Sequence, residues 1–511
     1  MSKGKEMTNN KILALNLVSS FITYAITFGI SFFLSPFIVE TVGVEAYGFV
    51  GLANNFISYA SLITIALNAL AGRFITIKLR ENDISSANKY YTSVFYGNLF
   101  LSAVLFIAAL FVWIFLEKII NIPDSIFWDV KILFAALFMN CIISTSTSVF
   151  GIATFATNKL YLSSVRNIEA SLIRTIILVV LFLCFSPNVY YLGITSLLVG
   201  IYSVVYNIYY TKKLTPELQL KRQYFDKKAV WELVSSGVWN LITRLGQILC
   251  DGVDLLITNL LVDPTSMGVL SLAKTVPGII QSIIGAMVNS FSPNFTILYA
   301  EGKINELKDA LKQSMKIMGV ISNVPIIILI VCGQKFFECW QPTQDAKALQ
   351  ILSILTCAGF IINGGINCIY DIFTVVNKLK YNSIVLLISS AISICVTFIL
   401  LKTTDLGVYA VAGVSTVIMI AKNVVLIVPY AAKCLDLKKT IFYPEIIRSI
   451  IFVAVSTVLG YFVNNAISFD GWFGFFFNAI IIGLMSLIIG TFVMLNKSDR
   501  QLLISKIRRK K

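Results

Sequence analysis

Long apolar stretches constrain the fold of this chain more than any other feature of its sequence. About 14 runs are apolar enough and long enough to cross a bilayer as a helix, which takes roughly 20 residues. Their positions are 14–39, 47–70, 92–116, 128–151, 168–186, 189–210, 235–261, 266–290, 317–333, 348–370, 382–401, 406–431, 447–467 and 471–495. In lipid, a helix pairs its own backbone polar groups. The sequence therefore predicts an all-α polytopic membrane protein with about 14 transmembrane helices.

The composition excludes several classes of protein. Of the 511 residues, 57% are apolar and only 13% are charged, whereas a soluble domain carries about 25% charged residues. The chain has no histidine, which excludes histidine-based zinc sites and Ser-His-Asp triads. It also has no P-loop and no dinucleotide fingerprint. We therefore expect a protein that is not an enzyme, with no catalytic residue, no cofactor and no metal site.

Basic residues are distributed unevenly between alternate loops. With the N-terminus placed in the cytoplasm, 32 of the 41 Lys and Arg residues fall in inside segments and five in outside loops. The other four lie within spans, at Arg174, Arg244, Lys274 and Lys422. Positive residues accumulate on the cytoplasmic side of membrane proteins. The net charge of +15 is therefore an orientation signal rather than a nucleic-acid footprint. We expect a multi-pass protein of the bacterial cytoplasmic (inner) membrane with both termini in the cytoplasm.

Two sequence segments recur in the same order. Residues 16–20 (NLVSS) resemble 232–236 (ELVSS), and residues 46–53 (AYGFVGLA) resemble 266–273 (SMGVLSLA). The matches pair span 1 with span 7 and span 2 with span 8, so both copies start on the same side of the membrane. Parallel repeats of this kind occur in two-lobed transporters. We predict two parallel-related six-helix lobes, an N-lobe at 1–215 and a C-lobe at 216–440, followed by spans 13 and 14 with a basic tail at 441–511.

Several short motifs resemble one known family. They are residues 36–48 (PFIVETVGVEAYG), the Asn54-Asn55 pair, residues 215–218 (TPEL), Trp239-Asn240 with Asp254, and Pro293 with residues 301–303 (EGK). Together they resemble polysaccharide repeat-unit flippases of the multidrug/oligosaccharidyl-lipid/polysaccharide exporter superfamily, over essentially the whole chain. The resemblance implies that the protein moves a polyprenyl-pyrophosphate-linked oligosaccharide from the cytoplasmic to the outer leaflet for surface polysaccharide synthesis.

A polar stripe runs along the predicted seventh span. Its members are spaced by three, four and seven residues, which places them on one helical face: Asn240, Arg244, Gln247, Asp251, Asp254 and Thr258. Charge inside a membrane usually faces a cavity or a partner. Lys274 in the eighth span lies at a depth similar to that of Asp251 and Asp254. These three residues form either a static ion pair that fixes the packing of spans 7 and 8, or a site for the substrate or for a coupling ion, H+ or Na+.

Arginines in the spans are the candidate substrate contacts. We expect Arg244 to be the principal contact of a cationic central cavity, with Asn240 and Gln247 beside it and Arg174 approaching from the first lobe. Arg73 ends the second span and is either a further contact or a flanking charge. For Arg174 the alternative is structural pairing. Because Arg binds a pyrophosphate through paired hydrogen bonds, a surplus of cations in the spans suits an anionic substrate.

Two other function classes remain as alternatives. One is a multidrug or toxic-compound extruder of the same superfamily, coupled to an ion gradient. The other is a membrane enzyme of envelope synthesis, which usually needs a sizeable outside loop, whereas the longest predicted one covers only 333–347. Within the flippase class, a lipid II-type flippase also remains open. The expected partners are the lipid-linked oligosaccharide, the bilayer and a coupling ion, with no nucleic acid. We expect a monomer, with association with a polysaccharide polymerase as the alternative.

Overall fold

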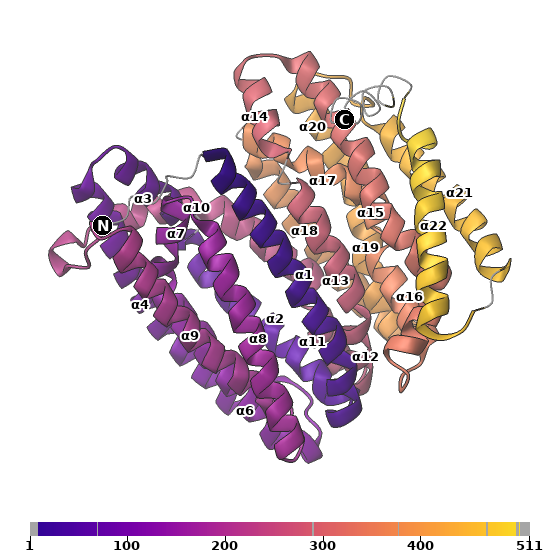
Figure 1. The fold of residues 1–511 in the computed structure, drawn as a ribbon, viewed down its shortest axis with the longest axis horizontal. Helices are drawn as coiled ribbons and strands as arrows, with labels where there is room; N and C mark the ends of the chain where they lie inside the picture. Colours follow the sequence, from indigo (N-terminus) through magenta and orange to yellow (C-terminus); the bar gives the residue numbers. More distant parts are fainter. Residues whose placement is uncertain are drawn as a thin grey trace. The chain divides into compact units, whose positions relative to one another are not determined.

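The computed structural model describes residues 9–68, 70–288, 291–376, 378–466, 469–496 and 500. Every regular element in these ranges is a helix, which confirms the predicted all-α fold (Figure 1). Thirteen helical segments of the described residues are long and apolar enough to span a membrane. They correspond to the predicted spans except the seventh, which is more polar than the others and whose helix is interrupted at Ile248–Gly252.

The first compact unit contains Met1–Ile248 and Asp263–Gly268. Its helices are α1 (Asn9–Val42), α2 (Val44–Asn68), α3 (Ala71–Arg80), α4 (Ile84–Ile114), α5 (Leu116–Ile119), α6 (Phe127–Thr147), α7 (Ile152–Ala156), α8 (Leu160–Cys184), α9 (Tyr190–Leu214) and α10 (Lys227–Gln247), with 3-10 turns at Asp124–Ile126, Ser148–Gly151 and Arg222–Tyr224. In this unit α1 packs on α8, α8 on α9, α9 on α6, α6 on α4, and α10 on α2. Figure 1 shows α1 and α8 side by side.

The second compact unit contains Leu249–Val262 and Val269–Lys511. Its helices are α11 (Asp254–Leu261), α13 (Thr275–Val288), α14 (Ser292–Ala300), α15 (Ile304–Trp340), α16 (Ala346–Cys357), α17 (Phe360–Val375), α18 (Leu379–Thr403), α19 (Val408–Lys422), α20 (Val428–Cys434), α21 (Tyr443–Ala466) and α22 (Gly471–Val493), with π-helical turns at Ile248–Gly252 and Asn423–Ile427. The helix α12 (Pro264–Ala273) has residues in both units. Within the second unit, α15 packs on α16, α17, α21 and α22.

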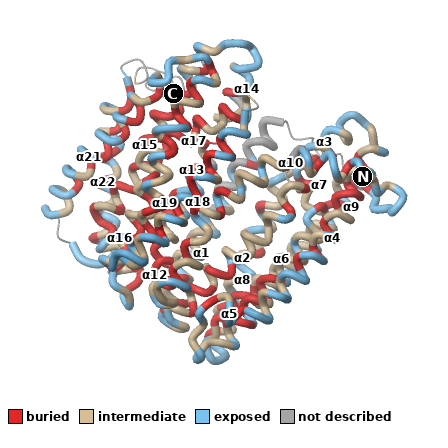
Figure 2. Tube along the Cα trace, turned by 180° about the vertical axis from the view of Figure 1, so that it is seen from behind, coloured by how far each residue is buried: buried red, intermediate tan, exposed pale blue. Residues whose placement is uncertain are grey.

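Several helices bury small polar residues and expose large apolar ones, which is unusual for a soluble protein. On α18, Ser383, Ser390 and Ser393 are buried, whereas Ile388 is 54% exposed. Exposed positions recur along α21 and α22 (Figure 2), and Phe473 of α22 is 68% exposed. Helices in lipid gain little from burying apolar side chains, so small residues that allow close approach occupy their interfaces. This burial pattern supports a membrane-spanning bundle.

Two tight turns set the directions of the first helices. Gly43 has a φ of 89°, a left-handed value that favours glycine, and α2 begins at the next residue. The chain therefore passes from α1 to α2 without a loop.

Asp83 caps α4, because its side chain accepts a hydrogen bond from the Ser86 backbone N–H at 3.0 Å. The same hydrogen bond holds the pKa of Asp83 below its usual value.

Two glycines at equivalent positions of the predicted repeat contact each other. A Cβ added to Gly48 would lie 2.7 Å from the Gly268 Cα, and one added to Gly268 would lie 2.2 Å from the Val44 backbone oxygen. The backbones of α2 and of the N-terminal half of α12 therefore approach to a distance that only glycine permits. This crossing fixes the start of α12 against α2 within the first unit.

The predicted domain limits rest on repeated spans rather than on packing. By its contacts, α10 belongs with the first six spans, since it packs on α2. In the same way, α21 and α22 belong with the second unit, since both pack on α15. The predicted lobe limits at 215/216 and 440/441 are drawn from the repeat in the sequence, which packing does not test. They stay predictions.

Candidate functional site

The helix α10 presents three of the predicted substrate contacts. Its N-terminus is fixed by Asp226, whose side chain accepts a hydrogen bond from the Lys228 N–H at 2.8 Å. Asn240, Arg244 and Gln247 follow at spacings of four and three residues, and all three are exposed. Arg244 Nη1 donates to Gln247 Oε1 at 3.2 Å. Among the described residues no carboxylate pairs with Arg244, so its charge is available to an anion.

Arg73 lies on α3, within the same apolar helical segment as the second span, Val44–Arg80. The helix α2 ends at Asn68, and α3 carries Arg73 in its first turn as an exposed residue. Because α3 packs on α4 and α7, its position in the first unit is fixed by these contacts. Among the described residues, Arg73 forms no hydrogen bond or ion pair with the α10 stripe, and Arg73 stays a candidate substrate contact.

The second unit brings together two of the three predicted ion-coupling residues. Lys274 Nζ lies 2.6 Å from Asp254 Oδ2 and also donates to the Asp251 backbone oxygen at 3.0 Å. Asp254 is 6% exposed, whereas the Asp251 side chain is exposed. Asp251 lies in the π-helical turn that precedes α11, and such turns often occur at functional positions. The geometry is a buried ion pair with one backbone contact, and it suits both helix packing and ion coupling.

A second polar cluster of the second unit was not predicted. Lys422 is 6% exposed, and its Nζ donates to the Tyr370 hydroxyl at 3.0 Å. The same hydroxyl donates to Asn423 Oδ1, and Asn423 Nδ2 donates to Asn363 Oδ1 at 2.7 Å. The sequence identified Lys422 only as a charge within a span. Tyr370 and Asn363 come from α17, and Asn423 begins the π-helical turn that follows α19. Residue spacing does not reveal that α17 packs against this turn.

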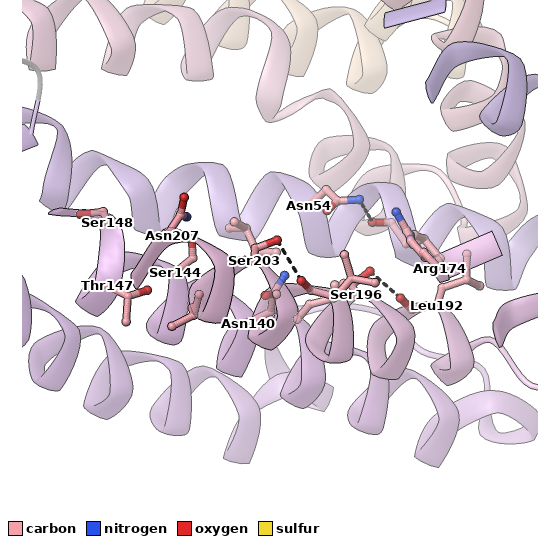
Figure 3. A pocket seen from close by; sticks show the side chains of 16 residues that line it. Asn54, Asn140, Ser144, Thr147, Ser148, Arg174, Leu192, Ser196, Ser203 and Asn207 are labelled. Carbon is pink, nitrogen blue, oxygen red and sulfur yellow. Dashed lines mark hydrogen bonds between the residues drawn. The ribbon is translucent and has the colours of Figure 1, made fainter. Parts of the chain in front are cut away.

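A cavity of about 510 Å³ lies within the first unit, between α2, α6, α8 and α9 (Figure 3). Arg174 of α8 lies at the end of the cavity that Leu192 lines, and polar side chains extend from there toward Ser148 (Figure 3). The neutral polar lining residues are Asn54, Asn140, Ser144, Thr147, Ser148, Ser196, Ser203 and Asn207. Of the residues that line the cavity, all of them described, only Arg174 is charged.

Arg174 has no partner among the residues that the structure describes. Its Nε atom is shielded from solvent and has no hydrogen-bond acceptor. Glu169, the acidic residue of α8, is bound to Arg166 and accepts a hydrogen bond from the Tyr202 hydroxyl at 2.6 Å. Because α8 runs from Leu160 to Cys184, Arg174 lies near the middle of the helix. The structural-pairing alternative for Arg174 therefore finds no carboxylate within the described ranges.

Sequence reasoning missed most of this cavity, although a signal was present. Polar or small residues repeat at spacings of three and four in two spans: Asn140, Ser144 and Thr147 on α6, and Ser196, Gly200, Ser203 and Asn207 on α9. These spacings place each set on one helical face. The signal is weak because hydroxyl and amide groups are common wherever helices meet in membranes. Only the packing of α6 on α9 shows that the two faces line one cavity.

Comparison with known structures identifies the fold. The chain is similar to an inward-facing multidrug resistance MATE family transporter of the MOP superfamily, with a TM-score of 0.70 and 11% identity over 83% of this chain and 98% of that chain. It is similar to the lipid II flippase MurJ in an inward closed conformation, with a TM-score of 0.67 and 14% identity over 94% of this chain and 98% of that chain. A MOP superfamily transporter from Pyrococcus furiosus Vc1, described as having a binding pocket of reverse polarity, matches with a TM-score of 0.60 and 12% identity over 84% of this chain and 99% of that chain. The fold is therefore that of the MOP-superfamily transporters.

The family follows from sequence similarity. The family described as Polysaccharide biosynthesis protein matches residues 13–298. The chain is also 24% identical over 502 residues to the uncharacterized membrane protein EpsK of Bacillus subtilis (strain 168), covering 97% of this chain and 98% of EpsK. The chain belongs to the Polysaccharide biosynthesis protein family, and it is a multi-pass membrane protein. The resemblance identified in the sequence motifs is confirmed.

Proposed function

We propose that the protein flips a polyprenyl-pyrophosphate-linked oligosaccharide repeat unit from the cytoplasmic to the outer leaflet for surface polysaccharide synthesis. Family membership supports a role in polysaccharide biosynthesis, and the fold supports transport. The observation that carries the proposal is that Arg244 and Arg174 have no carboxylate partner among the described residues. Two such guanidinium groups suit a pyrophosphate, which Arg binds through paired hydrogen bonds.

The proposed mechanism is alternating access with a cationic central cavity. Arg244 is the principal phosphate contact, Gln247 orients it, and Asn240 offers an amide to the sugar on the same exposed face. Arg73, exposed on α3, is a further contact on the proposed cytoplasmic side. An inside-negative potential favours outward movement of an anion by about 2.3 kcal/mol per charge per 100 mV. The membrane potential therefore supplies part of the driving force.

The ion pair of the second unit is the proposed coupling element. A proton or Na+ on Asp254 would weaken its attraction for Lys274, whose Nζ lies 2.6 Å from Asp254 Oδ2. The return of the empty transporter to its inward-facing state would be driven by the binding and release of this ion at Asp254. We further propose that the protein acts as a monomer in the bacterial inner membrane with both termini in the cytoplasm. Association with a polysaccharide polymerase is the alternative to a solitary monomer.

Substitution of Arg244 tests the proposal in cells that make the polysaccharide. Arg244→Ala removes the charge, so we expect surface polysaccharide to be lost and lipid-linked repeat unit to accumulate in the inner leaflet while the protein still inserts. Arg244→Lys keeps the charge but not the paired hydrogen bonds, and we expect partial export. The matched control is Lys228→Ala, which removes an exposed cation from the first turn of the same helix and should export normally.

Normal export by both Arg244→Ala and Arg174→Ala would contradict the cationic cavity. The multidrug extruder is then the second candidate, favoured by the similarity in fold to a multidrug resistance transporter. The discriminating measurement is drug efflux in the same strains. An extruder predicts that deletion of the gene sensitises cells to cationic drugs and leaves surface polysaccharide unchanged. A flippase predicts the opposite on both counts.

A further inference from the structure

The cavity of the first unit combines one unpaired charge with a long neutral polar lining. Arg174 provides the charge, and its Nε atom has no acceptor among the described residues. An unpaired cation within a span costs about 2.5–3.5 kcal/mol on insertion scales. An anion beside the guanidinium offsets this cost. The charge therefore indicates that one end of the ligand is anionic.

The neutral lining offers both hydrogen-bond donors and acceptors. The hydroxyls of Thr147, Ser196 and Ser203 donate to backbone oxygens of their own helices at 2.7, 2.6 and 2.9 Å, which leaves their oxygen atoms as acceptors. The Asn140 and Asn207 side chains form no hydrogen bond with another described residue, so each offers an amide N–H and an amide oxygen. A site for a plain anion needs donors alone. A mixed lining suits hydroxyl groups, which both donate and accept.

The dimensions of the cavity exceed those of a small ion. Ser196 and Asn207 are eleven residues apart on α9, which corresponds to about 16 Å along the helix. Gly200 keeps the middle of this length open, because a Cβ there would lie 1.9 Å from Asn140 Oδ1. Asn54 and Ser144 are exposed, so the cavity is accessible at the part that they line. The ligand is therefore elongated, with an anionic end and a row of hydroxyl groups.

We propose that this cavity is a glycosyl-phosphate site separate from the Arg244 contact, which holds a phosphate of the transported lipid at Arg174 and its first sugar along Asn140 toward Asn207. The identity of the ligand rests on the proposed function. The location is new: the lining comes from α2, α6, α8, α9 and the 3-10 turn at Ser148–Gly151 of the first unit, and no residue of the α10 stripe belongs to it. A soluble sugar phosphate has the same chemistry, and the test separates the two sources.

Photocrosslinking of the full-length protein in polysaccharide-producing cells tests the site. The crosslinking amino acid p-benzoylphenylalanine takes the place of Ser203, or of Ser144 if the first position impairs expression. The matched control position is Ile201, two residues away on α9 and 46% exposed. Carbohydrate on the purified protein is detected with a hydrazide probe after periodate oxidation. Phosphatidylglycerol also carries a head-group diol that periodate cleaves, so the mass of each adduct is measured to exclude this phospholipid. We expect the signal at Ser203 to exceed that at Ile201 several-fold.

Three further variants connect the signal to the residues of the site. Arg174→Gln should abolish the carbohydrate signal, and Arg174→Lys should retain part of it. Gly200→Ala should reduce it several-fold, because the added methyl group displaces Asn140. Arg166→Gln is the control for loss of charge on the same helix, since Arg166 is already paired with Glu169, and it should keep the signal. The mass of the adduct separates a polyprenyl-linked ligand from a soluble sugar phosphate, and either supports the site.

Equal carbohydrate signals at Ser203, Ser144 and Ile201 would overturn the inference, and so would a signal that survives Arg174→Gln. Adducts that carry phosphate without carbohydrate would also overturn it, since they indicate a plain anion site. Surface polysaccharide is measured in the same strains. Normal export without crosslinking contradicts the glycosyl-phosphate site and leaves the proposed function intact. Unchanged polysaccharide after deletion of the gene contradicts the proposed function itself.

Discussion

Two arginines of α8 illustrate how a neighbouring carboxylate decides what a charge can do. Arg166 is paired with Glu169, which also accepts a hydrogen bond from Tyr202. Arg174, two turns further along the helix, finds no such partner in the described structure and lines a cavity. The same residue type therefore fixes helix packing at one position and is available to a ligand at the other. The sequence identified Arg174 as a candidate substrate contact. Whether a carboxylate lies beside it depends on which helices pack around α8, and the sequence does not show this.

The Asp254–Lys274 pair gives a prediction about stability. Lys274→Ala leaves the buried carboxylate unpaired in a span, at a cost of about 2.5–3.5 kcal/mol on insertion scales. We expect a fall in Tm of several degrees for the purified protein, and partial recovery in the Lys274→Ala/Asp254→Asn double variant, because the orphaned charge is gone. Lys303→Ala breaks an exposed pair with Glu301 and should change Tm little.

The same variants separate the two roles of the pair. If the pair couples transport, Asp254→Asn keeps a folded protein whose flipping no longer responds to the ion gradient. Wild-type dependence on the gradient in Asp254→Asn would contradict coupling. A Tm of Lys274→Ala equal to that of the wild type would contradict the stabilising role.

Elements were predictable to different degrees, and the reasons are physical. Apolar length is a strong signal, so thirteen of the predicted spans appear as helical segments of the described chain. Helix ends are weaker signals: α15 begins at Ile304, well before the predicted 317–333, because charged residues in its first turns hide the helix from hydropathy. The interruption at Ile248–Gly252 contains no proline and was not anticipated. The cavity of the first unit needs the packing of α6 on α9, which no single span reveals.

The crossing of α2 and α12 gives a prediction at the scale of elements. In Gly268→Ala, the new methyl group meets the Val44 backbone oxygen at 2.2 Å, and backbone cannot move aside cheaply. Overpacking typically costs about 1–3 kcal/mol, so we expect a lower Tm and reduced export. Gly278→Ala on α13 is the matched control, because nothing lies within 4 Å of its Cβ position. Equal Tm values for the two variants would contradict a close crossing.

The membrane topology of the whole molecule, with both termini in the cytoplasm, stays a prediction. The Lys and Arg distribution predicts both termini in the cytoplasm, which requires an even number of crossings. Thirteen segments of the described residues qualify as spans, so the prediction requires that α10 and α11 cross the membrane together as the remaining one. The orientation of the termini therefore decides how the interrupted seventh segment is inserted.

Reporter fusions measure this orientation. We expect a fluorescent protein fused to the C-terminus to be fluorescent and alkaline phosphatase fused there to be inactive. Alkaline phosphatase fused after Thr343, between α15 and α16, should be active, which controls for export of the reporter. An active phosphatase at the C-terminus would mean an odd number of crossings and would contradict the insertion of α10 and α11 as one span.

The contact between Gly48 and Gly268 has a consequence for the ancestry of the chain. In a two-fold symmetric dimer, a residue near the axis meets its own copy, so one codon determines both sides of the contact. If the predicted duplication joined two such copies, one ancestral glycine became these two, and each has since been free to mutate alone. The steric demand is nevertheless shared, since a methyl group on either side closes the same gap between backbones. A half-length relative that assembles as a dimer would need only one glycine codon for this contact. Any substitution of that glycine would then appear on both sides of the contact.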